Sequence, residues 1–194
     1  LYVGGVVFAP ATNPSTSLRA SERIKYLENL GINDSKKLSA NRRKLLSKVI
    51  QKECSAYHIS TITVTQINRI GIGKATFHAM RDVVQSLCNR TSNDKYFVLV
   101  DGFYIKYLRN IGLKNQKGIV KGDEISLSIA AASIIAKVAR DKHMIKLSAK
   151  FPNYGWARNK GYGTLFHRVA LKKFGKTLLH RTDFIKNSFQ GLAL

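Results

Sequence analysis

The chain has 194 residues, of which 44% are hydrophobic, and its 33 Lys and Arg against 11 Asp and Glu give a formal net charge of +22. A chain of this length and hydrophobic content can bury a core, which excludes a disordered basic tail. So large a positive charge favours a polyanionic partner such as a nucleic acid over the alternative, a basic surface kept for solubility.

The first half of the chain alternates between strand and helix patterns. Residues 1–9 form an apolar run that predicts a buried strand, and residues 10–21 are rich in Pro, Ser and Thr, which is typical of a polar loop. Residues 39–53 predict a helix capped by the Ser at its start, residues 57–64 a strand, and residues 65–87 a second helix.

The second half continues this alternation. Residues 96–100 predict a short apolar strand and residues 165–174 a short basic helix, and between them residues 126–147 predict the longest helix. Small Ala side chains in that helix allow its backbone to lie close to a sheet. This order predicts an α/β protein, and we expect one mixed sheet that contains the strands at 1–9, 57–64 and 96–100.

The C-terminal region is strongly basic. Residues 142–182 contain no acidic residue. Aromatic side chains lie among the cations and suit contacts with sugars and bases, or alternatively only pack the C-terminal helices; they are Tyr154, Trp156, Tyr162 and Phe166. We expect residues 151–194 to form a basic helical extension packed on a domain of residues 1–150.

The cysteines and histidines do not predict a metal centre or a disulfide. Cys54 and Cys88 stand alone, which favours a reduced, cytoplasmic protein, and the five His residues are dispersed without a zinc signature.

No apolar run approaches the length of a membrane span and no signal peptide is visible, so we expect no membrane partner.

Two carboxylates stand where they can converge on a metal ion. Asp101 ends the apolar run of residues 96–100, and Asp123 precedes the long helix. In so basic a protein, such a pair suits metal-assisted attack on a phosphodiester. Taken alone, Asp101 can also be a turn residue at a strand end, and Asp123 a helix N-cap.

Five motifs in series resemble those of ribonuclease HII, and they cover almost the whole chain in the right order. Any one of them is weakly specific, but the series is specific, and the sister type ribonuclease HIII fits less well. They are Gly-Ile-Asn-Asp-Ser-Lys-Lys-Leu-Ser at 31–39, Val-Asp-Gly at 100–102, Val-Lys-Gly-Asp at 120–123, Ser-Ile-Ala-Ala-Ala-Ser-Ile-Ile-Ala-Lys-Val-Ala-Arg-Asp at 128–141, and Lys-Gly-Tyr-Gly-Thr at 160–164 followed by His167.

The resemblance implies a ribonuclease H-like mixed sheet flanked by helices, with a helical C-terminal appendage. It also implies an endonuclease that hydrolyses the RNA strand of RNA/DNA hybrids and cuts 5′ of single ribonucleotides in duplex DNA, as a monomer. Asp101 and Asp123 match two of the four acidic residues that hold Mg²⁺ or Mn²⁺ in this family. One ion is expected to activate the attacking water and the other to stabilise the leaving oxygen.

The resemblance also implies substrate contacts. Lys36 and Lys37 lie in a loop that the family places at the nucleic-acid backbone, although an ordinary solvated pair is the alternative. Lys160, Gly161 and Tyr162 belong to the loop whose Tyr packs at the junction between ribonucleotide and deoxyribonucleotide, and the alternative is a Tyr that only anchors the loop.

Four further polar residues receive weaker assignments. Ser133 and Lys137 share a helix face that either faces the site or only packs and meets solvent. Asp141 is expected to be a structural ion-pair partner, and Glu124 a solvated acid.

The chain departs from the family at its start. Ribonuclease HII proteins carry an Asp-Glu pair and a Gly-Arg-Gly turn before the strand that begins here at Leu1, and we expect the parent protein to carry them as well. The alternative functions are a non-catalytic basic nucleic-acid-binding protein and another metal nuclease of the same broad fold. Asp101 and Asp123 discriminate against a pure binder, because acids among phosphates repel the ligand.

Overall fold

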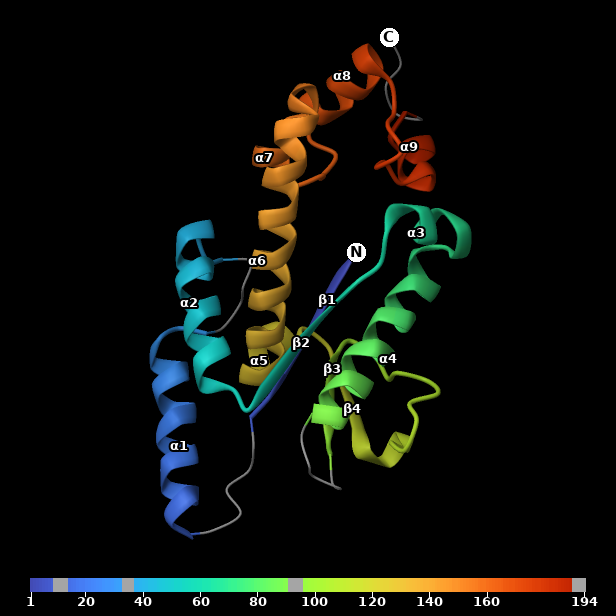
Figure 1. The fold of residues 1–194 in the computed structure, drawn as a ribbon. Coiled ribbons are helices and arrows are strands. Elements are labelled where there is room, and N and C mark those ends of the chain that lie inside the picture. The colour runs from blue at the N-terminus through green and yellow to red at the C-terminus, as the bar shows by residue number, and fades with distance from the viewer. Residues whose placement is uncertain (9–13, 33–36, 91–95, 190–194) are drawn as a thin grey trace. The chain divides into compact units, whose positions relative to one another are not determined.

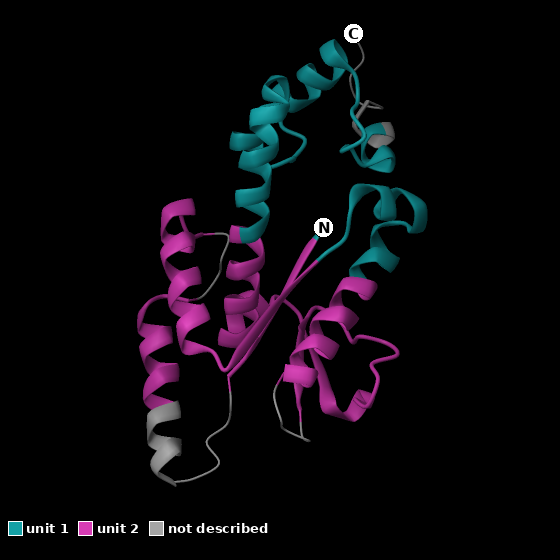
Figure 2. Cartoon of the chain, viewed as in Figure 1, with its two compact units in different colours: residues 1, 61–76, 139–194 teal, residues 2–60, 77–138 magenta. Residues whose placement is uncertain are grey.

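The computed structural model describes residues 1–8, 14–32, 37–90 and 96–189. They group into two compact units, of which unit 1 comprises residues 1, 61–76 and 139–194, and unit 2 comprises residues 2–60 and 77–138 (Figure 2). The division of the chain at residue 150 that we expected from the sequence stays a prediction.

Unit 2 contains the strand pair that opens the chain. Strand β1 (Tyr2–Val7) lies beside β2 (Ala56–Thr61), and the two run in opposite directions (Figure 1). The backbone N–H of Ser55 donates to the carbonyl oxygen of Val7 at 2.8 Å, where the end of β1 meets the start of β2. Both strands begin within a residue of their predicted positions, but β2 ends three residues early.

Two consecutive glycines in β1 allow helices to pack closely on both faces of this pair. A Cβ on Gly4 would lie 2.5 Å from the carbonyl oxygen of Ala132 in α6 (Leu127–Lys150), and one on Gly5 would lie 2.4 Å from Cγ1 of Val83 in α4 (Ile72–Arg90). Because successive strand residues point to opposite faces, α6 covers one face and α4 the other. The expectation that the Ala-rich helix lies close to a sheet is confirmed.

Helices α1 (Pro14–Asn29) and α2 (Ala40–Glu53) complete the core on the α6 side. The Ser39 hydroxyl accepts a hydrogen bond from the backbone N–H of Arg42 at 3.2 Å, which confirms the predicted cap. The buried core residues are Leu27, Ile32, Leu46, Ile50, Ala130, Ala131, Ile134 and Ile135. The predicted loop at residues 10–21 is wrong from Pro14 onward, because proline is compatible with the first turn of a helix and begins α1 there.

A second pair of strands lies in the same unit. Strand β3 (Val98–Asp101) pairs in parallel with β4 (Gln116–Ile119), in a register that places Val98 opposite Gln116 and Asp101 opposite Ile119. Within the described residues the strands therefore form two separate pairs, and the expectation that three strands share one sheet is wrong. The pairing partner of β3 is the segment Gln-Lys-Gly-Ile, which has no strand pattern. The α/β class itself is confirmed.

The predicted helix at residues 65–87 is two helices. Thr63 caps α3 (Val64–Ile70) in a reciprocal arrangement with Gln66, and α3 ends at Gly71, where φ is 79°. Because only glycine adopts such a φ readily, the chain breaks there before α4 begins.

Unit 1 also contains the C-terminal elements η2 (Pro152–Tyr154), α7 (Trp156–Asn159), α8 (Leu165–Phe174) and α9 (Thr182–Phe189). Of these, α8 has the predicted bounds and α9 was not predicted. Tyr154 and Trp156 are buried in a small core with Ala170 and Leu171, so these two aromatics do pack the C-terminal helices. Across the described ranges, no helix is both long and apolar enough to cross a membrane.

Candidate active site

Asp101 contacts the segment that carries Asp123. Asp101 is the last residue of β3 and its Oδ1 accepts a hydrogen bond from the backbone N–H of Gly122 at 2.9 Å. Asp123 follows as the second residue of the short helix α5 (Gly122–Ile125) and is only 3% exposed. The predicted strand-end position of Asp101 is confirmed, and its carboxylate lies against the peptide that leads into Asp123.

Local backbone geometry explains this close approach. Lys121 adopts a left-handed conformation with φ 54° and turns the chain into α5. Gly122 then lacks the Cβ that would lie 2.5 Å from Cδ1 of Ile129 and 3.4 Å from Oδ1 of Asp101. A side chain at position 122 would therefore press on the Ile129 side chain and contact the Asp101 carboxylate.

The donor set fits a hard divalent cation. Two carboxylates offer only oxygen ligands, which are the ligands that Mg²⁺ and Mn²⁺ prefer. Across the part of the chain that the structure describes, no three His, Cys, Asp or Glu side chains gather into a metal site. Glu124 is exposed, as expected for a solvated acid.

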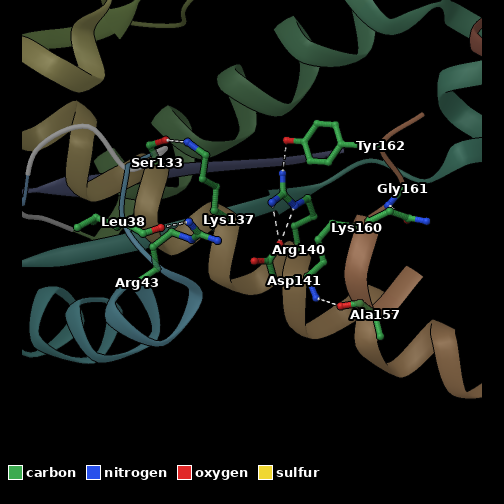
Figure 3. Close-up of polar contacts among 11 residues, drawn as sticks. Leu38, Arg43, Ser133, Lys137, Arg140, Asp141, Ala157, Lys160, Gly161 and Tyr162 are labelled. Atoms are coloured by element: carbon green, nitrogen blue, oxygen red, sulfur yellow. Dashed lines mark hydrogen bonds and ion pairs between the residues drawn. The ribbon is translucent and has the colours of Figure 1, made fainter. Parts of the chain in front are cut away.

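The Tyr162 loop belongs to unit 1 and is held by its own side chains. Asn159 Nδ2 donates to the carbonyl oxygen of Tyr154 at 2.7 Å, and its Oδ1 accepts from the N–H of Gly161 at 2.8 Å. Lys160 and Gly161 both adopt left-handed φ values, 52° and 84°. The ammonium of Lys160 donates to the carbonyl of Ala157 (Figure 3). Tyr162 is 60% exposed, so its ring is available to a ligand.

Arg140 on α6 holds the Tyr162 side chain. Its Nη1 donates to the Tyr162 hydroxyl at 2.8 Å, and its Cζ lies 5.3 Å from the centre of the ring (Figure 3). The same guanidinium pairs with Asp141 at 2.7 Å, which confirms Asp141 as an ion-pair partner. Sequence reasoning missed Arg140, because nothing in its spacing from Tyr162 indicates a contact.

Of the other predicted residues, the structure describes Ser133, Lys137 and Lys37. Lys137 Nζ donates to Ser133 Oγ at 2.7 Å, which confirms their shared helix face. Lys37 is exposed, and the loop that carries it is fixed at Leu38, whose carbonyl accepts from Arg43 Nη1 at 2.5 Å (Figure 3). Lys36 lies outside the described residues.

The chain matches the family model for ribonuclease HII over residues 2–191. It is 40% identical over 185 residues to the ribonuclease HII of Caldicellulosiruptor bescii, an alignment that covers 95% of this chain and 82% of that protein. The chain belongs to the ribonuclease HII family. It is therefore an endoribonuclease of the ribonuclease H type. Ribonucleases of this family depend on divalent metal ions and act on RNA/DNA substrates.

Solved structures share the fold. A chain from the structure of the PCNA:RNase HII complex from Archaeoglobus fulgidus aligns with a TM-score of 0.66 at 23% identity, over 87% of this chain and 85% of that chain. The crystal structure of Bst-RNase HIII in complex with Mn²⁺ aligns with a TM-score of 0.65 at 18% identity, over 87% of this chain and 60% of that chain. At these identities the likeness shows the fold alone.

Proposed function

We propose that this chain hydrolyses the RNA strand of RNA/DNA hybrids and cuts 5′ of single ribonucleotides in duplex DNA. In this proposal Asp101 and Asp123 hold the catalytic Mg²⁺ or Mn²⁺. The observation that carries it is the hydrogen bond from the Gly122 N–H to Asp101 Oδ1 at 2.9 Å, because it fixes the Asp101 carboxylate at the residue that directly precedes Asp123. The Mn²⁺ complex of a ribonuclease HIII with the same fold is consistent with the choice of ions.

The chain's own residues supply orientation and charge. The Gly122 N–H fixes the Asp101 carboxylate, and burial of Asp123 restricts its rotation, so both acids are preorganised before substrate arrives. When bound, a divalent ion lowers the pKa of a coordinated water and stabilises the charge that develops on the phosphate. Asp101 and Asp123 offset the charge of that ion in a protein that is otherwise strongly basic.

Substrate contacts are proposed for Lys36, Lys37, Lys160, Gly161 and Tyr162. The exposed ring of Tyr162, fixed by Arg140, is suited to pack against a deoxyribose face, where no 2′-hydroxyl is in the way. The left-handed Gly161 lets the backbone beside that ring approach a ligand closely. Lys36 and Lys37 are proposed to contact backbone phosphates, with their charge as the support.

The test is cleavage of a labelled RNA/DNA hybrid in Mg²⁺ and in Mn²⁺. It uses the chain extended at its N-terminus by the Asp-Glu and Gly-Arg-Gly segment that the family resemblance calls for. Asp101→Asn and Asp123→Asn should each nearly abolish cleavage while hybrid binding persists, because the amide keeps the shape and removes the charge. The exposed neighbour Glu124→Gln is the matched control and should cleave normally. Near-normal turnover by either Asn variant would overturn the assignment.

Two further expectations stay predictions. The free thiols of Cys54 and Cys88 are consistent with a reducing compartment, and we propose a cytoplasmic location on that basis. The monomeric state is proposed from the resemblance alone.

A further inference from the structure

The segment between β3 and β4, residues 102–115, is firmly held in unit 2, and we call it the β3–β4 loop. The buried side chain of Gln116 accepts from the N–H of Ile105 at 3.0 Å and donates to the carbonyl oxygen of Ile105 at 3.2 Å. Ile105 and Ile111 are themselves buried, at 3% and 7% exposure. The loop therefore has its own anchors and a defined conformation.

Helix α4 supports the same loop. The rings of Phe77 and Phe103 lie 5.2 Å apart, and Arg81 Nη1 donates to the carbonyl oxygen of Lys106 at 3.2 Å. Two contacts on successive turns of α4 thus fix the first half of the loop. In Figure 1 this is the yellow-green segment between β3 and β4.

Two tyrosines on this fixed loop stand in solvent. Tyr104 is 50% exposed and Tyr107 is 88% exposed. Tyr107 also has φ 61°, a left-handed conformation that a bulky side chain rarely adopts, and Asn110 has φ 63°. A strained backbone that holds an aromatic ring in water suggests a ligand for that ring.

The loop is also free of negative charge. Between Asp101 and Asp123 the chain contains no Asp or Glu. Its cations Lys106, Arg109 and Lys114 are exposed, and so are Lys117 and Lys121, which follow the loop. Exposed aromatics among cations on a rigid support match the surfaces that bind single-stranded nucleic acid, where bases stack on rings and cations follow the phosphates.

We propose that the β3–β4 loop binds single-stranded nucleic acid, with bases stacked on Tyr104 and Tyr107. Because the loop begins one residue after Asp101, the bound strand is an unpaired tail that continues from a hybrid in the active site. This last step rests on the proposed function, whereas strand binding by the loop does not. A surface that binds a protein instead is an outcome that the experiment separates.

The first experiment measures binding of a fluorescent oligothymidylate of about 15 nucleotides by anisotropy, in EDTA so that no cleavage occurs. Tyr104→Ala and Tyr107→Ala should each weaken binding about fivefold or more, and the two Phe variants should retain it, because stacking needs the ring and not the hydroxyl. Tyr26→Ala is the matched control, since Tyr26 is 49% exposed and, unlike the loop tyrosines, has acidic residues close to it in the sequence, Glu22 and Glu28. No binding by the wild type, or equal affinity of the double Ala variant, would overturn the proposal.

The second experiment locates the strand by photocrosslinking with an oligonucleotide that contains 5-iodouracil. Crosslinks in the peptide that carries Tyr104 and Tyr107 are expected, and crosslinks confined to other peptides would contradict the proposal.

The results distinguish a failure of the proposed function from a failure of strand binding by the β3–β4 loop. Loss of hybrid cleavage with intact strand binding would count against the proposed function, and normal cleavage with no strand binding would count against the loop.

Discussion

The guanidinium of Arg140 donates a hydrogen bond to the hydroxyl of Tyr162 at 2.8 Å. On its other edge the same guanidinium is held by Asp141 through Nε and Nη2, at 3.0 and 2.7 Å. The exposed Tyr162 side chain is therefore oriented by a helix and not only by its own loop. Arg140 is a positioning residue, and its effect on cleavage should pass through Tyr162.

Tyr162→Ala should slow cleavage at a single ribonucleotide more than cleavage of a continuous hybrid, because only the junction offers its ring a deoxyribose face. Arg140→Met should shift the ratio of the two rates in the same direction but less. The double variant should be no slower than Tyr162→Ala alone, since contacting residues are not additive. Rates are measured on matched duplexes with the N-terminally extended protein.

Arg158→Met is the control for loss of one positive charge, because Arg158 is exposed in the same basic region. It should leave the ratio of rates unchanged. Equal losses on both substrates would make Tyr162 a loop anchor, and additive effects of Arg140 and Tyr162 would contradict their coupling.

Replacing Lys36 and Lys37 together with Ala should flatten the salt dependence of hybrid affinity. Each phosphate neutralised releases counterions, so the slope of log affinity against log salt should fall in magnitude by up to about two units. Lys44→Ala with Lys48→Ala, two exposed lysines on α2, is the control pair. An unchanged slope would assign Lys36 and Lys37 to the ordinary solvated surface.

Gln116→Leu should destabilise unit 2, because it removes the partners of a buried N–H and a buried carbonyl of Ile105. Each orphaned group costs about 1–3 kcal/mol, so we expect a loss of roughly 2–4 kcal/mol in the free energy of unfolding by urea. Gln85→Leu is the control, since the hydrogen bond of Gln85 to Asn89 is exposed. A loss below about 0.5 kcal/mol would show that the loop does not depend on this contact.

His180 should make the protein acid-sensitive. Burial and the nearby His167 lower the pKa of His180 from 6.5 to about 4, and its ring stacks on that of His167 with centres 5.4 Å apart. Because the folded pKa lies below the unfolded value, the native state binds fewer protons. Stability from this group is complete above pH 6.5 and is lost as the pH falls toward 4.

The loss should reach about 2–3 kcal/mol near pH 4. It is measured as the free energy of unfolding against pH for the wild type and for His180→Gln, whose curve should be flatter between pH 6.5 and 4. Replacement of the exposed His78 with Gln is the control. Parallel curves for the wild type and His180→Gln would contradict the prediction.

The sequence was sufficient to predict features that depend only on residues close together in the chain. Ser39 predicts the start of its helix because an N-cap depends only on the residues of the first helical turn. Asp101 is recognisable as a strand end because the apolar run stops there. The motif at 120–123 placed Asp123 at a helix start, and the structure has α5 begin at the residue before it.

The features that sequence missed depend on contacts between distant residues. Gln116 begins a strand while its polar side chain is buried, and only the contact with Ile105 satisfies it. Arg140 positions Tyr162 through a hydrogen bond, and the spacing of the two residues matches neither a helical nor a strand period. The start of helix α1 has a loop-like sequence because its first turn is rich in Ser and Thr, residues that turns and helix starts share.

The close packing of Gly4 in β1 against α6 makes the proposed metal site sensitive to the interior of the protein. A methyl group at Gly4 would press on the backbone of Ala132, and α6 continues from α5, since the N–H of Ser126 donates to the carbonyl of Gly122 at 2.8 Å. Any outward shift of α6 therefore moves the segment that bears Asp123. A random-mutation survey scored by nuclease activity should find position 4 as intolerant as Asp101 or Asp123, the two proposed metal ligands.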